Sequence, residues 1–134
     1  MSAYETRNAT IEYTRLGVHH TDHGILSFSI GLVGGGWGQA FGQWALDTHE
    51  EGVRQRAPTT LGSSLLLGID RLLGCDWEDL VGKAVRCYAH HSKVFAIGHY
   101  LQDQWLWYNA LVDAFVTTTF EAMSRAAEAT DASR

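Results

Sequence analysis

The segment from Ile25 to Asp47 alternates large apolar residues with small ones, and this pattern leaves few folds open. In its first half the apolar residues stand two positions apart, which predicts a half-buried β-strand. Three consecutive glycines, Gly34–Gly36, then predict a hairpin turn. In its second half one face of the predicted strand carries only small residues, namely Gly38, Ala40 and Gly42. Because glycine weakens a strand, these residues indicate that the chain itself or a ligand approaches the backbone closely.

The flanking sequence predicts a small α+β fold. Residues 10–17 read as a strand, residues 47–58 as a polar loop, and residues 83–101 as a second hairpin. A threonine before an apolar 3.6-residue pattern and a closing Gly74 predict a helix in the middle of the chain. Residues 105–129 show helical spacing, which predicts a C-terminal helix. We therefore expect an antiparallel β-sheet of about five strands with a middle and a C-terminal helix, in one domain over 1–134 with flexible ends at 1–9 and 130–134.

Composition excludes several classes of protein. With 134 residues, 46% of them hydrophobic and 19% charged, the chain suits a single globular domain. The net charge of -5 disfavours DNA or RNA as a partner, but it allows a small phosphorylated ligand held by a few arginines. No apolar run reaches the roughly 18 residues of a membrane span, and the start of the chain lacks a secretory leader. Cys75 and Cys87 form no CxxC motif and read as buried free thiols of a reducing compartment.

Catalytic signatures are weak. Three histidines precede the strand at Ile25 and three more surround the second hairpin, but neither group has the spacing of a zinc motif. The glycine-rich turn joins two strands and has no P-loop lysine, and Cys87 falls on the predicted core face. Asp76, Glu78 and Asp79 read as turn or capping residues. We expect no metal, no cofactor and no enzymatic activity.

Tryptophan and arginine are the more informative residues. Most of the five tryptophans suit a core or a subunit interface, and one or two beside an arginine suit stacking on a purine. Arg54 and Arg56 lie in the predicted loop, and Arg86 alternates outward on a strand. We expect a phosphate to be held by Arg56 or Arg86, with Arg54 as the third candidate.

The order of these motifs resembles the phage-encoded Thoeris anti-defence sponges. The matching positions, spread over residues 10–107, are Leu16–Gly17, Asp22–Gly24, Gly38–Gly42, Asp47, Val85–Arg86, Ala96–His99, Asp103 and Trp105. Proteins of that family bind cyclic ADP-ribose isomers made by bacterial TIR-domain enzymes, and some also trap cyclic trinucleotides. Their subunits are small and β-rich, and they assemble beyond the monomer with ligand pockets between subunits. This chain departs from the pattern at Gln104, where a basic residue is expected, and the segment after Trp107 has no counterpart.

The resemblance implies a non-enzymatic phage protein of the host bacterial cytoplasm that sequesters a cyclic nucleotide messenger. It implies a homo-oligomer, either a dimer or an assembly of dimers, with no membrane partner. The expected ligand-binding residues are His23, Gly24, Arg54, Arg56, Trp77, Arg86, His99, Asp103 and Gln104. Two alternatives remain open: a metal-dependent enzyme that uses the histidines to degrade such a messenger, and a structural phage protein without a small ligand.

Overall fold

The computed structural model describes residues 4–19, 25–49, 56–90 and 93–132, and its fold is α+β. Its main sheet is antiparallel, has seven strands and follows the order β3-β2-β1-β6-β7-β8-β9. The strands of this sheet are β1 (Tyr4–His19), β2 (Ile25–Gly34), β3 (Trp37–Ala45), β6 (Ala84–His90), β7 (Lys93–His99), β8 (Trp105–Asn109) and β9 (Ala114–Thr118). The other elements are β4 (Asp47–His49), β5 (Arg56–Pro58), α1 (Thr60–Leu73), the 3₁₀ turn η2 (Trp77–Asp79) and α2 (Phe120–Ala132). The predicted fold class is confirmed, and the sheet is larger than the expected five strands.

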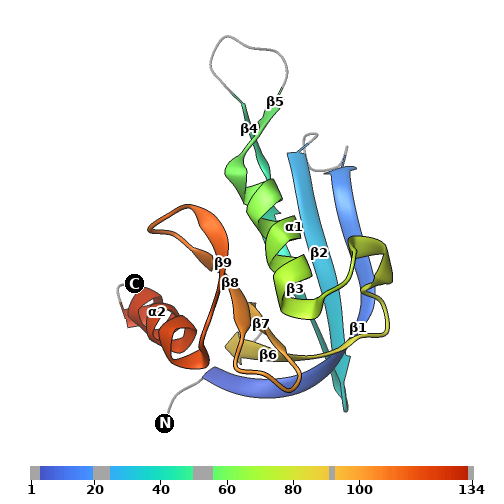
Figure 1. Cartoon of the computed structure of the whole chain (residues 1–134), viewed down its shortest axis with the longest axis vertical. Coiled ribbons are helices and arrows are strands. Elements are labelled where there is room, and N and C mark those ends of the chain that lie inside the picture. Colours follow the sequence, from blue (N-terminus) through green and yellow to red (C-terminus); the bar gives the residue numbers. More distant parts are fainter. Residues whose placement is uncertain (1–3, 20–24, 50–55, 91–92, 133–134) are drawn as a thin grey trace.

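The sheet is strongly curved. The long strand β1 bends along its length and pairs with β2 over its second half and with β6 over its first half (Figure 1). This curvature brings β3 close to β7, although the two strands are not neighbours in the sheet. The inside of the curl holds the main core, and α1 packs there beside β8 and β9.

Helix α1 has the apolar spacing that the sequence predicts. Its buried residues are Leu61, Leu65, Gly68, Ile69 and Leu72, and it ends at Gly74, whose φ of 66° is left-handed. A side chain at Gly68 would collide with Leu106 of β8, so the glycine lets the helix lie close to the sheet. The Ser64 hydroxyl accepts a hydrogen bond of 2.9 Å from the backbone N–H of Phe115, which ties α1 to β9.

The opposite face of the sheet is covered by α2. The buried residues of this second cluster are Tyr88, Ala96, Trp105, Trp107, Met123 and Ala127. Tyr4 stacks on Tyr88 with ring centroids 5.1 Å apart, and its hydroxyl donates to the carbonyl of Ala127. Residues 4–9 form the first part of β1, and residues 130–132 continue α2.

The C-terminal helix is shorter than the sequence pattern indicates. Residues 105–118, expected to be helical, form the β8–β9 hairpin, and α2 begins at Phe120. The turn of this hairpin contains Asp113 at a φ of 48°, and the Asn109 side chain accepts a hydrogen bond there from the N–H of Leu111. The β-branched run at Val116–Thr118 favours a strand, and pairing with β8 outweighs the helical spacing. Residues 47–58, expected to be a loop, contribute the short antiparallel pair β4 and β5.

Candidate functional site

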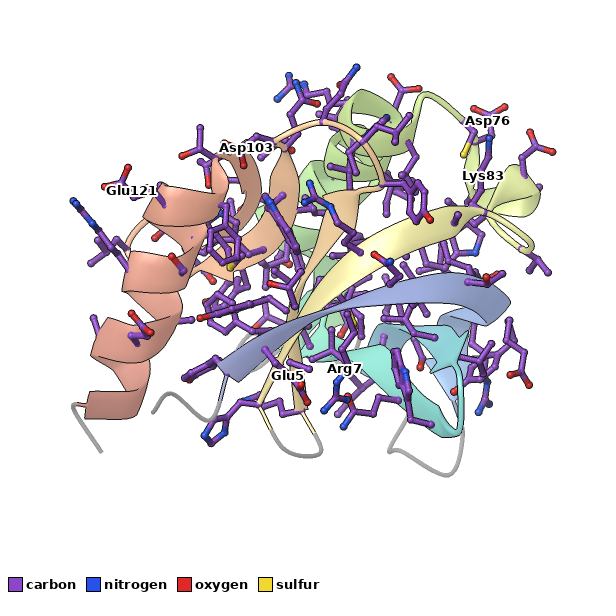
Figure 2. All side chains as sticks on the ribbon, turned by 90° about the horizontal axis from the view of Figure 1, so that it is seen from below. Glu5, Arg7, Asp76, Lys83, Asp103 and Glu121 are labelled. Atoms are coloured by element: carbon purple, nitrogen blue, oxygen red, sulfur yellow. The ribbon has the colours of Figure 1, made fainter. Side chains whose placement is uncertain are left out.

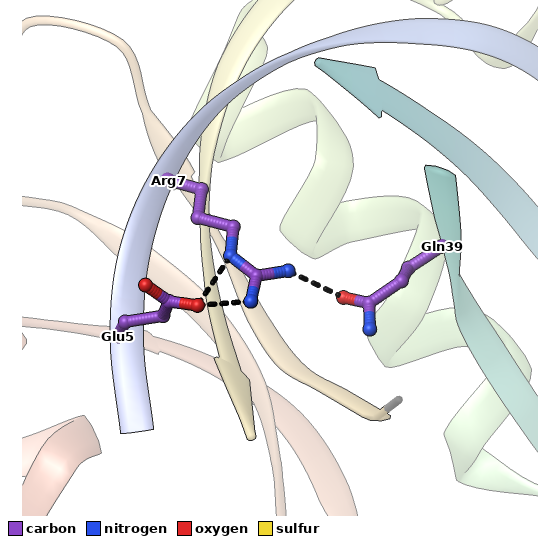
Figure 3. Close-up of polar contacts among 3 residues, drawn as sticks. All are labelled: Glu5, Arg7 and Gln39. Carbon is purple, nitrogen blue, oxygen red and sulfur yellow. Dashed lines mark hydrogen bonds and ion pairs between the residues drawn. The ribbon is translucent and has the colours of Figure 1, made fainter. Parts of the chain in front are cut away.

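A half-buried arginine of β1, Arg7, lies at the centre of the most promising polar cluster (Figure 3). Its Nε donates to a carboxylate oxygen of Glu5 at 2.8 Å, and Nη2 donates to the same oxygen. Its Nη1 donates to the side-chain oxygen of Gln39 at 3.2 Å. The guanidinium carbon lies 5.2 Å from the ring centroid of Trp37, which is a cation–π distance.

The curvature of the sheet assembles this cluster. Arg7 is opposite Cys87 in the pairing of β1 with β6 and shares a face of β1 with the core residues Ala9 and Ile11, so its side chain points into the curl. Gln39 and Trp37 reach it from β3, two strands away in the sheet order. The cluster thus places a guanidinium, an indole and an amide together. These groups can bind a phosphate, stack on a base and hydrogen-bond a base edge.

Sequence reasoning did not find Arg7, because the first strand was placed at residues 10–17. The available signal is the two-residue spacing of Arg7, Ala9 and Ile11, which places them on one face and extends the strand toward the start of the chain. An arginine on the inward-facing positions of a strand is unusual and needs an acceptor. Here the acceptors are Glu5 and Gln39.

Arg86 is the other arginine that lies over a tryptophan, and its contacts are structural. Its guanidinium carbon is 4.9 Å from the ring centroid of Trp105, an indole that is 0% exposed. Its Nε donates to the carbonyl of His99 at 2.8 Å, and its Nη2 donates to the carbonyl of Gln102 at 2.7 Å. Both acceptors are backbone carbonyls of the turn, which cannot rotate away as a side-chain acceptor can, so these donors are not released to a phosphate.

Three further residues of the resemblance lie around Arg86, in the turn between β7 and β8. The Nδ1 atom of His99 accepts hydrogen bonds of 3.0 Å from the N–H groups of Leu101 and Gln102. The carbonyl of Gln104 accepts from the N–H of His99, which closes the turn. Asp103 accepts from the N–H of Phe120 at 2.8 Å, at the first residue of α2. The structure therefore brings Arg86, His99, Asp103 and Gln104 together and gives each a role in this turn.

The remaining expected site residues lie elsewhere. Trp77 is on η2, where its ring meets the edge of Phe28, and it stands between Asp76 and Glu78. Those carboxylates would repel a phosphate. His23, Gly24 and Arg54 lie outside the described residues, and Arg56 is described only as part of the backbone of β5.

The two thiols differ in their surroundings. Cys87 is 0% exposed, on the inner face of β6 with Val85 and Ala89, which confirms its predicted place in the core. Burial raises the pKa of Cys87 to about 11, so the thiol is protonated and unreactive near neutral pH.

In the part of the chain that the structure describes, no three His, Cys, Asp or Glu side chains are arranged to hold a metal ion.

Comparisons with protein-family models, curated proteins and solved structures gave no match. Neither of the two described α-helices is long and apolar enough to cross a membrane.

Proposed function

We propose that the protein binds and sequesters a cyclic nucleotide messenger, foremost a cyclic ADP-ribose isomer, without cleaving it. The motifs shared with the Thoeris anti-defence sponges suggest this class of ligand. The observation that carries the proposal within the structure is the cluster of Arg7, Trp37 and Gln39. It is the one Arg–Trp pair of the described residues whose indole is not fully buried.

The chemistry of such a ligand matches that cluster. A cyclic ADP-ribose isomer carries a charged pyrophosphate and an adenine ring. Taking phosphate oxygens out of water is unfavourable unless charged donors replace their hydrogen bonds, and a guanidinium can do so with two parallel bonds. Trp37 offers a ring face for the purine, and the Gln39 amide can both donate to and accept from a base edge. In this structure the Arg7 guanidinium is bonded to the Glu5 carboxylate, so a phosphate must displace that carboxylate in order to bind.

The first test is the replacement of Arg7. We expect Arg7→Ala to weaken binding of the preferred cyclic ADP-ribose isomer by about 10- to 150-fold, the effect of losing charged hydrogen bonds worth roughly 1.5–3 kcal/mol. We expect Glu5→Gln to tighten binding, because it removes the competing carboxylate. Isothermal titration calorimetry against a panel of cyclic nucleotides measures both effects.

The matched control is Arg125→Ala, which removes an arginine that pairs with Glu121 on the exposed face of α2. It should bind like the wild type. If Arg7→Ala binds normally while Arg54→Ala or Arg56→Ala does not, the phosphate is held by those residues and the assignment to Arg7 is wrong. Heating the loaded protein separates sequestration from catalysis, because a sponge releases the ligand intact and an enzyme releases a product.

We also propose that the protein is a homo-oligomer. Apolar side chains stand out at both turns that flank β8, with Leu101 84% and Leu111 95% exposed. Their neighbours Tyr100 and Val112 are exposed as well, and apolar side chains that gather on a surface mark interaction sites. Light scattering at low micromolar concentration should give a mass of at least twice 14.8 kDa. A mass equal to one chain would contradict this expectation.

A further inference from the structure

A shallow hollow of about 320 Å³ lies between β1, α1 and the segment that leads into η2. Its apolar surface comes chiefly from Leu16, Leu66 and Trp77. Leu16 is 41% exposed and Leu66 is 46% exposed, so a good part of this surface faces solvent. A ligand with an apolar body would remove that surface from water, which is favourable. The volume is at the small end of the range for sites that bind small molecules.

The charged groups around the hollow are mostly acidic. Asp70, Asp76 and Glu78 line it from two elements, and all three side chains are exposed. Of the described residues that line it, none is basic. The ammonium of Lys83 acts on this region as well, and Figure 2 shows Lys83 at the same end of the molecule as Asp76. One ammonium does not offset three carboxylates, so the hollow favours positive charge.

The thiol of Cys75, which also lines the hollow, responds to this field. Burial raises its pKa, the Lys83 ammonium lowers it, and the carboxylates of Asp79, Asp76 and Asp70 raise it further. The three carboxylates act on Cys75 in the direction that disfavours a thiolate, and the same carboxylates would favour a bound cation over an anion.

We propose that this hollow binds a small organic cation with an aromatic or alkyl body, such as an aryl-trimethylammonium ion. The apolar body would contact Leu16 and Leu66, and the charged end would lie between the indole of Trp77 and the carboxylates of Asp76 and Glu78. Tryptophan is the best side chain for holding a quaternary ammonium through its ring face. The site is separate from the Arg7 cluster, so the inference does not rest on the proposed nucleotide function.

The charge of the hollow can be measured through Cys75. It is the accessible thiol of the two cysteines, because Cys87 is buried. We compare the rates at which Cys75 reacts with two thiosulfonate reagents, one carrying a cationic trimethylammonium-ethyl group and one an anionic sulfonato-ethyl group. Each rate is divided by the rate at which the same reagent modifies a small thiol in solution. The ratio of the two rates cancels the pKa of Cys75. We expect the cationic reagent to be favoured by about fivefold, and the preference to fall toward one in the double variant Asp76→Asn, Glu78→Gln. Glu12→Gln, a carboxylate change on β1 outside the hollow, should leave it unchanged.

Binding is then tested with benzyltrimethylammonium as the probe. It should slow the modification of Cys75 by neutral iodoacetamide in the wild type and in Glu12→Gln, and much less in the double carboxylate variant. Benzenesulfonate, a similar anion, should not protect the thiol. The carboxylate variants alter exposed side chains and should fold, which keeps the test decisive. Equal rates for the two charged reagents, or equal protection by the two probes, would overturn the proposal.

Discussion

We expect Gly42→Ala to destabilise the protein by about 3 kcal/mol, the upper range for forcing extra atoms into a packed site. A Cβ atom at Gly42 would lie 2.5 Å from the carbonyl oxygen of Phe28 and 2.9 Å from the Cα of Ser29. Both are backbone atoms of β2, at the point where the β2–β3 pairing shifts register. They cannot move without breaking the ladder. The melting temperature, measured by circular dichroism, should fall by roughly 10 °C.

The same strand offers a matched control in Gly38, which pairs with the same neighbour, β2. A Cβ there would lie 3.7 Å from its nearest atoms, which is ordinary van der Waals contact. Gly38→Ala should therefore leave the melting temperature nearly unchanged. If the two variants melt together, close backbone approach is not the reason for glycine at position 42.

Glycines elsewhere in the sheet lie beneath aromatic rings of the chain itself. The ring of Tyr13 covers Gly31, the ring of Trp37 covers Gly34, and the ring of Trp105 covers Gly98. The sequence alone could not choose between packing by the chain and approach by a ligand. At these three positions the structure shows the chain's own side chains in the space that a Cβ would take.

The hairpin of β2 and β3, the hairpin of β6 and β7, and the helix α1 could be predicted because their local signals agree. Alternation, turn glycines and a helix-ending Gly74 each indicate the same structure as the tertiary packing. The β8–β9 hairpin could not be predicted from the sequence, because the spacing of its apolar residues also suits a helix over short distances. Its strand conformation is decided by pairing with β7, a contact between strands that the apolar spacing of the hairpin itself does not indicate.

The candidate site was harder to predict than the fold. Arg86, His99 and Asp103 were expected to bind a ligand, and they do lie together, but their polar atoms are used within the turn. The sequence pattern can single out polar residues, but it does not show which groups they hydrogen-bond. Arg7 needs the curl of the sheet to meet Trp37 and Gln39, and that curvature has no local signature.

Arg86→Ala is expected to destabilise the fold by about 2–4 kcal/mol, the sum of lost charged hydrogen bonds and a cation–π contact. Arg86 is half-buried, so it should contribute more to stability than an exposed arginine of the surface does. The variant leaves the carbonyls of His99 and Gln102 without their donor and uncovers the ring of Trp105. Chemical denaturation should show a lower midpoint with an unchanged slope.

Variants at the same position separate a structural from a ligand-binding role for Arg86. Arg86→Lys keeps the charge but lacks the planar fork that reaches two carbonyls, so it should recover only part of the lost stability. Arg125→Ala, which removes an arginine that is 77% exposed, should change stability by less than about 0.5 kcal/mol. If Arg86→Ala melts like the wild type yet loses nucleotide binding, the turn does not need this side chain. Arg86 would then be the phosphate ligand, as the motif resemblance implies. The opposite outcome has two parts: Arg86→Ala loses stability, and Arg86→Lys, where it is folded, still binds the nucleotide. That result would place the phosphate contact at another arginine.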